Sequence, residues 1–260
     1  MITELIHTAV RNAPRKPYKG LHASALGYCP RVHYYKIKGI QATTPPNLGA
    51  LMNFKMGDVW EGTLLKLIDG LDDVKIIKED VKQQWHIPDL NLYGETDYPL
   101  EINGKKIIVD CKTVNSMWFK YVEHEWNKAK ELGISKNEFL LKRNPEYEIQ
   151  QGAYLLMAKL LGKKYDHATL LFVNKDNSFI GWEVDIYLTK DLENDLMEKI
   201  GDMNFWLKNN ELPPCTCEGW KIGYCDYGNP DTRELNSKKK EVNTECCDIK
   251  LKGVKDESNG

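Results

Sequence analysis

The fold is decided by the stretch YGETDYPLEINGKKIIVDCKT, residues 93–113. Asn103-Gly104 lies in its middle, and this pair is the strongest short signal for a β-hairpin, because a type I′ turn needs positive φ at both central residues. The turn therefore folds a second strand back on the first. Successive side chains of a β-strand point to opposite faces. The stretch thus predicts a hairpin whose second strand presents Asp110 and Lys112 on one face.

Acidic residues on both strands of this hairpin indicate a metal site. Asp97 precedes the turn on the partner strand, so pairing of the strands would bring two carboxylates and one ammonium together. This combination suits a hard divalent cation with a lysine beside the water that it activates. The alternative is an exposed Asp-Lys salt bridge, which is common and stabilises little. The apolar residues 107–109 directly before Asp110 favour burial, and a buried carboxylate needs a metal or a cation beside it.

The composition is that of a soluble globular protein. Of 260 residues, 42% are apolar and 28% are charged, which suits one sizeable domain with appendages. The formal net charge of −2 gives no argument for nucleic-acid binding by the chain as a whole, although residues 1–20 form a basic segment that can contact phosphate. The sequence has neither an apolar run of about 18 residues nor a secretory leader, so we expect a cytoplasmic protein inside a cell.

Cysteine usage points to a second metal site. The count of seven is odd and the expected compartment is reducing, so a disulfide framework is not expected. Cys215, Cys217 and Cys225 lie in a turn-rich segment where thiolates can be aimed without disturbing a helix or strand. A tetrahedral zinc site or a cubane iron–sulfur cluster takes four such ligands, and Cys29 is the natural fourth, although a lone cysteine is more often a small buried apolar residue.

The remaining pattern alternates between helices and strands. Strands are predicted at 74–77, 81–87, 167–173 and 179–187, and the first two lead into the hairpin, so that a sheet of at least three or four strands is expected. Helices are predicted at 56–70, 116–132, 145–161 and 192–207. Glu61 lies in the first of these helices and offers a third carboxylate, whereas Gln150 and Tyr154 share one face of the third because they are four residues apart.

The ordered set of a helical acid, Asp97, Asp110-Cys111-Lys112 and Gln-x-x-x-Tyr, flanked by one early and three late cysteines, resembles the RecB-like branch of the PD-(D/E)xK nuclease superfamily. It is most similar to the iron–sulfur exonucleases that include the CRISPR adaptation nuclease and the nuclease domain of AddB. The resemblance covers residues 21–227 as one nuclease domain, between the basic segment 1–20 and a charged tail, 228–260, that we expect to be mobile, with Cys246 and Cys247 unligated.

This resemblance implies an α/β (α+β) fold with a central mixed β-sheet flanked by helices, as in restriction endonucleases. It also implies roles for individual residues. One or two Mg²⁺ or Mn²⁺ ions would be held by Glu61, Asp97, Asp110 and the backbone carbonyl of Cys111. Lys112 would position the attacking water and help to deprotonate it, and Gln150 and Tyr154 would brace the site and contact the DNA backbone. A structural 4Fe-4S cluster would be bound by Cys29, Cys215, Cys217 and Cys225.

The implied function is a metal-dependent DNA exonuclease that acts on single-stranded ends in recombination, replication or CRISPR adaptation, with proteins of those processes as partners. One alternative is a DNA-binding or recruitment subunit with a vestigial nuclease site. Another is a binding module with a structural zinc site, since four thiolates bind zinc as well as iron.

Overall fold

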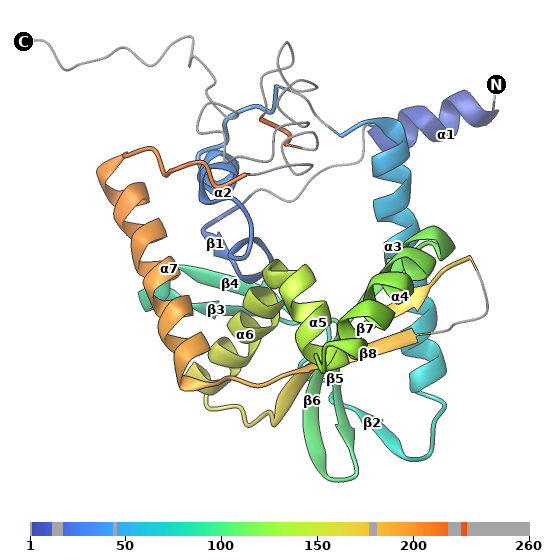
Figure 1. Ribbon diagram of the computed structural model, residues 1–260. Coiled ribbons are helices and arrows are strands. Elements are labelled where there is room, and N and C mark those ends of the chain that lie inside the picture. Colours follow the sequence, from blue (N-terminus) through green and yellow to red (C-terminus); the bar gives the residue numbers. More distant parts are fainter. Residues whose placement is uncertain (1, 12–17, 44–45, 177–180, 218–224, 228–260) are drawn as a thin grey trace, which may run out of the picture.

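The computed structural model describes residues 2–11, 18–43, 46–176, 181–217 and 225–227 of the chain (Figure 1). The predicted tail 228–260, with Cys246 and Cys247, lies outside these residues. The helices are α1 Ile2–Arg11, α2 Pro30–Ile37, α3 Leu48–Ile68, α4 Ser116–Glu131, α5 Lys136–Arg143, α6 Pro145–Leu160 and α7 Lys190–Asn209. The strands are β1 Leu21–His22, β2 Val74–Ile76, β3 Gln84–Ile87, β4 Leu92–Glu95, β5 Tyr98–Ile102, β6 Lys105–Val114, β7 His167–Asn174 and β8 Gly181–Ile186.

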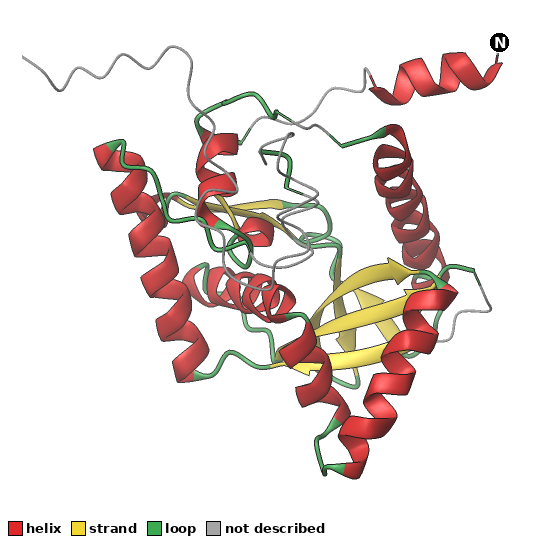
Figure 2. Cartoon of the chain, turned by 45° about the horizontal axis from the view of Figure 1, so that its top comes forward, coloured by secondary structure: helices red, strands yellow, loops and turns green. Residues whose placement is uncertain are grey.

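A mixed five-stranded sheet forms the centre of the fold, in the order β2-β5-β6-β7-β8. Strands β6 and β7 run parallel and the other neighbours run antiparallel. Helices lie on both sides of the strands, so the predicted fold class, a central mixed sheet flanked by helices, is confirmed (Figure 2). None of the described helices is both long and apolar enough to span a membrane.

The predicted hairpin is β5–β6, and its turn has the predicted backbone. Asn103 and Gly104 both have positive φ, 52° and 76°, as a type I′ turn requires. Strand β6 also alternates as predicted. Ile108 belongs to the large core beneath α6 and α7, whereas Val109 and Cys111 belong to a second core beneath α3. Each face of the hairpin is therefore covered by a different helical layer.

One predicted strand is wrong in extent and in sheet. The stretch 81–87 was expected to continue the hairpin's sheet, but only Gln84–Ile87 is a strand, and it pairs with β4 in a separate sheet of order β1-β4-β3. The chain changes sheets at Thr96 and Asp97, between β4 and β5. Thr96 is fully buried and its hydroxyl donates a 3.0 Å hydrogen bond to the carbonyl of Asp80, which fixes this corner. Residues 93–113 therefore contribute to both sheets.

The N-terminal segment contains a helix that the sequence did not predict. Helix α1 contacts α3, and it carries Ile2 and Leu5 on its exposed surface.

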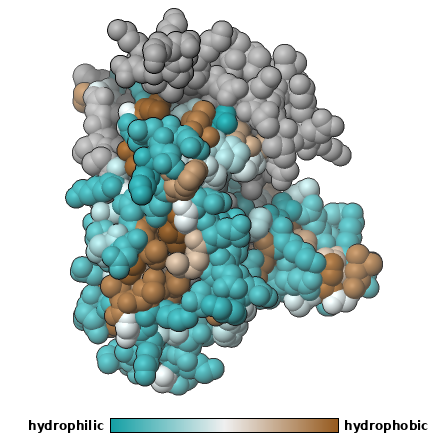
Figure 3. Space-filling model, turned by 90° about the vertical axis from the view of Figure 1, so that its left-hand side faces the viewer, coloured by the Kyte–Doolittle hydropathy of each residue, from teal (hydrophilic) through white to brown (hydrophobic). Residues whose placement is uncertain are grey.

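On the face that contains α7, hydrophilic residues surround a patch of apolar ones (Figure 3).

Candidate active site

Asp110 and Lys112 form a buried ion pair on the α6 side of β6. Their side chains share a face because they are two residues apart, and Lys112 Nζ lies 2.8 Å from Asp110 Oδ2. The Asp110 side chain is only 4% exposed. The ammonium also lies 5.2 Å from the ring centroid of Tyr147 on α6. The predicted Asp-x-Lys pair is therefore not an exposed surface salt bridge.

Gln151 on α6 completes the surroundings of Asp110. Its Nε2 donates a 2.6 Å hydrogen bond to Asp110 Oδ2, and the side chain is fully buried. Its Oε1 has no hydrogen-bond donor among the described residues, although a buried amide oxygen normally has one. The sequence analysis missed Gln151 and selected its neighbour. The signal was the i, i+4, i+7 spacing of Tyr147, Gln151 and Tyr154, which places these three side chains on one face of α6.

Gln150 and Tyr154 do contact each other, as their spacing predicts. Gln150 Nε2 donates to the Tyr154 hydroxyl over 3.3 Å, and both residues are 6% exposed. Tyr154 also packs against β4. A Cβ at Gly94 would lie 3.1 Å from its Cε1, so the glycine permits this close approach. This burial suits the predicted bracing role, and the predicted contact with DNA stays a prediction.

Asp97 and Glu61 approach the same end of the hairpin from two other elements. Tyr98 pairs with Val109, so Asp97 stands opposite Asp110, one residue beyond the ladder. Glu61 comes from α3. A single ammonium, that of Lys82, joins the two acids: its Nζ lies 3.0 Å from Glu61 Oε2 and 2.8 Å from Asp97 Oδ1. The structure therefore brings the three predicted carboxylates into one neighbourhood.

Burial and the charge of Asp97 raise the pKa values of the other two acids. The pKa of Asp110 is raised by burial and further by the charge of Asp97, although Lys112 opposes the shift. The pKa of Glu61 is also raised, first by burial and then by Asp97. For Lys112, burial lowers the pKa but the carboxylate of Asp110 outweighs it, so that the pKa is raised overall. A group of carboxylates that disfavour one another's charge is stabilised by an added cation.

The donor set fits a hard divalent cation. Three carboxylates and a backbone carbonyl are oxygen ligands of the kind that Mg²⁺ and Mn²⁺ take. The unpartnered Gln151 Oε1 is an acceptor suited to a metal-bound water. The thiol of Cys111 is not a candidate ligand, because it faces the core beneath α3 and burial raises its pKa to about 12. The predicted ligand is the backbone carbonyl of Cys111, and that role stays a prediction.

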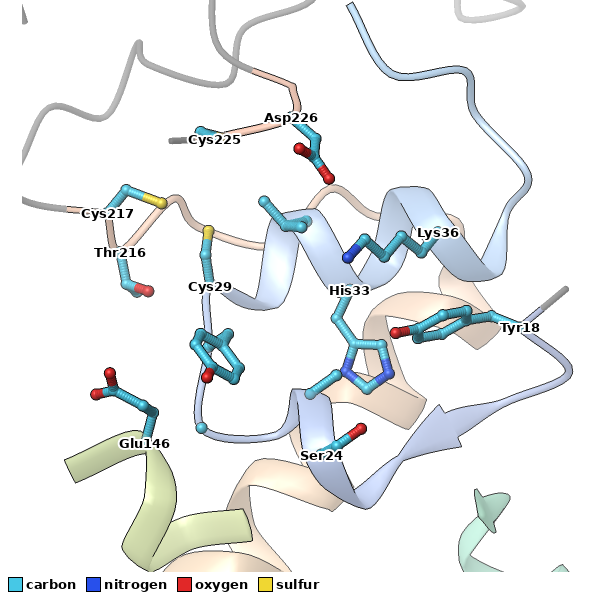
Figure 4. A pocket seen from close by; sticks show the side chains of 14 residues that line it. Tyr18, Ser24, Cys29, His33, Lys36, Glu146, Thr216, Cys217, Cys225 and Asp226 are labelled. Atoms are coloured by element: carbon cyan, nitrogen blue, oxygen red, sulfur yellow. The ribbon is translucent and has the colours of Figure 1, made fainter. Parts of the chain in front are cut away.

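Three of the four predicted cluster ligands are brought together. The thiols of Cys29, Cys215 and Cys217 lie within 4.8 Å of one another, and the Cys29 and Cys215 sulfurs are 4.0 Å apart. All three are buried and none forms a disulfide. Cys225 is outside this triad, but it is also buried, and it lines a cavity of about 370 Å³ together with Cys29 and Cys217 (Figure 4). These thiols are ligands of the kind that a zinc ion or an iron–sulfur cluster takes, and either would need Cys225 as its fourth ligand.

The two chain segments that carry these cysteines are also held together without a metal. Arg31 Nε donates to the Pro213 carbonyl over 2.7 Å, and the Tyr227 hydroxyl donates to the Ile40 carbonyl over 3.2 Å. The Tyr227 ring lies 5.0 Å from that of Tyr35 on α2. The early and late cysteine segments are therefore adjacent in the fold, as the predicted cluster requires.

Comparison with known proteins gives weak matches of structure alone. No protein-family model and no curated protein matches the chain. Among solved structures it is similar to SSO0001, with a TM-score of 0.47 and 17% identity over 87% of this chain and 94% of that one. It is also similar to the alkaline exonuclease LHK-Exo of Laribacter hongkongensis, with a TM-score of 0.43 and 9% identity over 75% of this chain and 91% of that one. It is similar as well to a phage-related exonuclease from Haemophilus somnus 129PT, with a TM-score of 0.33 and 16% identity over 50% of this chain and 60% of that one.

These similarities establish no family. The three TM-scores are all below 0.5, so the chemistry of the site has to be argued from this chain's own residues. Those residues provide clustered oxygen ligands, a half-buried lysine beside them and a buried amide that orients one carboxylate. Such a site can hold divalent ions and orient a water molecule.

Proposed function

We propose that this protein is a metal-dependent DNA exonuclease of the PD-(D/E)xK type, which hydrolyses phosphodiester bonds. The observation that carries the proposal is the meeting of Asp97, Asp110 and Lys112 at the open end of the β5–β6 hairpin, with Glu61 beside them. A simple surface salt bridge does not account for a buried aspartate with both a lysine and a glutamine bound to it.

In this proposal Glu61, Asp97, Asp110 and the Cys111 carbonyl hold one or two Mg²⁺ or Mn²⁺ ions. When bound, the ions supply a nucleophilic hydroxide and neutralise charge on the phosphate. Lys112 stays protonated at neutral pH, since Asp110 raises its pKa. It therefore orients the water by donating a hydrogen bond and favours the hydroxide electrostatically. Gln151 holds the Asp110 carboxylate in place, and Gln150 with Tyr154 supports the helix behind it.

The finer parts of the proposal rest on the resemblance of the motif set to the RecB-like iron–sulfur exonucleases. They are action on single-stranded DNA ends and a place in recombination, replication or CRISPR adaptation. A 4Fe-4S cluster bound by Cys29, Cys215, Cys217 and Cys225 would clamp the early and late segments of the domain. Zinc is the alternative occupant, because the same thiolates bind it. Iron and zinc analysis of the purified protein, together with its colour, distinguishes the two.

The direct test is an assay with end-labelled single-stranded and double-stranded DNA in Mg²⁺, Mn²⁺ or EDTA. We expect progressive shortening from an end that EDTA abolishes. Asp110→Asn should remove the activity. Asp58→Asn, which changes an exposed carboxylate on α3 that pairs with Lys55 in its own helix, should not. Metal-independent cleavage, or full cleavage by Asp110→Asn, would contradict the proposal.

One observation favours a second function, a DNA-binding or recruitment subunit with a vestigial site. Lys82 already neutralises two of the acids that should bind the metal. If this pairing is permanent, the chain would bind DNA without cutting it. DNA binding that is unchanged by EDTA and by Asp110→Asn, with no cleavage under any metal, would support this alternative.

A further inference from the structure

The ammonium of Lys82 lies between Glu61 and Asp97, two of the proposed metal ligands. Its Nζ touches one oxygen of each acid, at 3.0 and 2.8 Å. Neither the motif pattern nor the proposed mechanism uses this lysine. Its side chain is 46% exposed, so the ammonium has a free route to solvent.

The backbone aims this lysine at the acids. Lys82 has a positive φ of 51°, and its N–H donates to the Thr96 carbonyl over 3.1 Å. Two residues earlier, the buried Asp80 accepts hydrogen bonds from Lys163 Nζ at 2.5 Å and from the Tyr165 hydroxyl at 2.6 Å. The turn that carries Lys82 is thus tied to β4–β5 and to the segment after α6. An ordinary solvated lysine needs no such anchoring.

The charge balance of the site depends on this ammonium. Three carboxylates, Glu61, Asp97 and Asp110, face two ammonium groups, those of Lys112 and Lys82, which leaves a net charge of −1. Removing Lys82 would make it −2. An ion that binds Glu61 and Asp97 draws on the same two carboxylates that Lys82 contacts, so ammonium and metal compete for the same negative charge.

We propose that Lys82 is an internal counter-cation that competes with the divalent metal and sets the metal concentration at which the site fills. In the metal-free protein it holds Glu61 and Asp97 together, and it moves out to solvent when the ion binds. This inference rests on the proposed function, since it requires a metal site at these acids.

The test is calorimetric titration of the full chain with Mn²⁺, which needs no substrate. We expect Lys82→Met to bind Mn²⁺ roughly 10-fold more tightly than the wild type, since one unit charge within a few ångströms of an ion changes its binding energy by that order even in water. Lys82→Arg, which keeps the charge, should show no tightening. The matched control is Lys78→Met, which removes an exposed lysine from the same connection, where its Nζ lies 3.9 Å from Asp69. It should leave Mn²⁺ affinity unchanged.

Asp110→Asn shows whether the calorimetric signal comes from Mn²⁺ bound at the three acids, because binding there should weaken strongly in that variant. If the wild type binds Mn²⁺ at this site and Lys82→Met binds it equally or more weakly, the role of Lys82 is refuted while the proposed function stands. Tightening that appears equally in Lys78→Met also refutes it, since the effect would be one of net charge. Binding seen only in Lys82→Met supports the inference in its strongest form. If no variant binds Mn²⁺, the metal site and the proposed function fail, and the inference fails with them.

Discussion

Asp97 stands opposite Asp110 across the β5–β6 pair, one residue past the point where Tyr98 pairs with Val109. Directly opposed carboxylates are unfavourable on a sheet unless a cation lies between or beside them. Here each acid has its own lysine, Lys82 on Asp97 and Lys112 on Asp110. Both acids at the end of the hairpin are therefore paired with a cation. We expect metal affinity and activity to depend on these pairs.

Loss of either member of the buried pair should abolish cleavage. We expect Asp110→Asn and Lys112→Met each to reduce cleavage of end-labelled DNA at least about 100-fold, because the first removes a proposed metal ligand and the second the group that orients the water. Circular dichroism should show the wild-type fold in both. Cleavage near the wild-type rate by either variant, in the presence of Mg²⁺ or Mn²⁺, would refute the assignment.

Gln151 should matter more than Gln150. Gln151→Leu leaves the buried Asp110 carboxylate without its 2.6 Å donor, so we expect a loss of about 1–3 kcal/mol in the free energy of unfolding and a clear loss of activity. Gln150→Leu removes a longer, 3.3 Å bond to a tyrosine hydroxyl and should cost less on both measures. Chemical denaturation and the DNA assay check the order. The reverse order would mean that the tyrosine contact, not the aspartate contact, supports the site.

The sequence predicts the local parts of this site well. The hairpin follows from Asn103-Gly104, and the shared face of Asp110 and Lys112 follows from a period of two, so both depend on residues close together in the chain. Gln151 was missed because neighbouring residues of a helix point about 100° apart, and the pair Gln150 and Tyr154 was chosen instead of the face shared by Tyr147, Gln151 and Tyr154.

Other features depend on distant contacts. The change of sheet at Thr96 needs the buried bond to Asp80, and the position of Lys82 needs the left-handed backbone of its turn and an anchor at Lys163. Lys163 is 83 residues away from Asp80 in the sequence. No local periodicity encodes such a contact, so Lys82 could not be found from the sequence pattern.

The contribution of Asp110 to the stability of the metal-free protein should fall as pH rises from its unfolded pKa to its folded pKa. The pKa of Asp110 is raised in the folded state, mainly by burial, so the folded protein binds its proton more tightly than the unfolded chain does. That contribution is complete below the unfolded pKa, about 3.9, and is lost as pH rises through the folded pKa. Thermal melting in EDTA across this range should show the decline, and Asp110→Asn should reduce it.

The same linkage predicts that divalent metal stabilises the protein most where Asp110 is ionised. Adding Mn²⁺ should therefore raise the melting temperature more at pH 7 than near pH 4, because a ligand that binds only the folded state stabilises it. An equal rise at both pH values would indicate that the metal binds elsewhere.

The cysteine ligands should respond to substitution according to their position. Cys29 is the proposed early ligand, 186 residues from Cys215, so Cys29→Ser should lose iron or zinc and lower the melting temperature, since closing so long a loop removes much entropy from the unfolded chain. Cys111→Ser is the matched control, because its thiol is equally buried but faces the separate core beneath α3. It should keep the full metal content. If Cys29→Ser retains all of its iron or zinc while Cys246→Ser or Cys247→Ser loses it, the ligands come from the tail and the assignment of Cys29 is wrong.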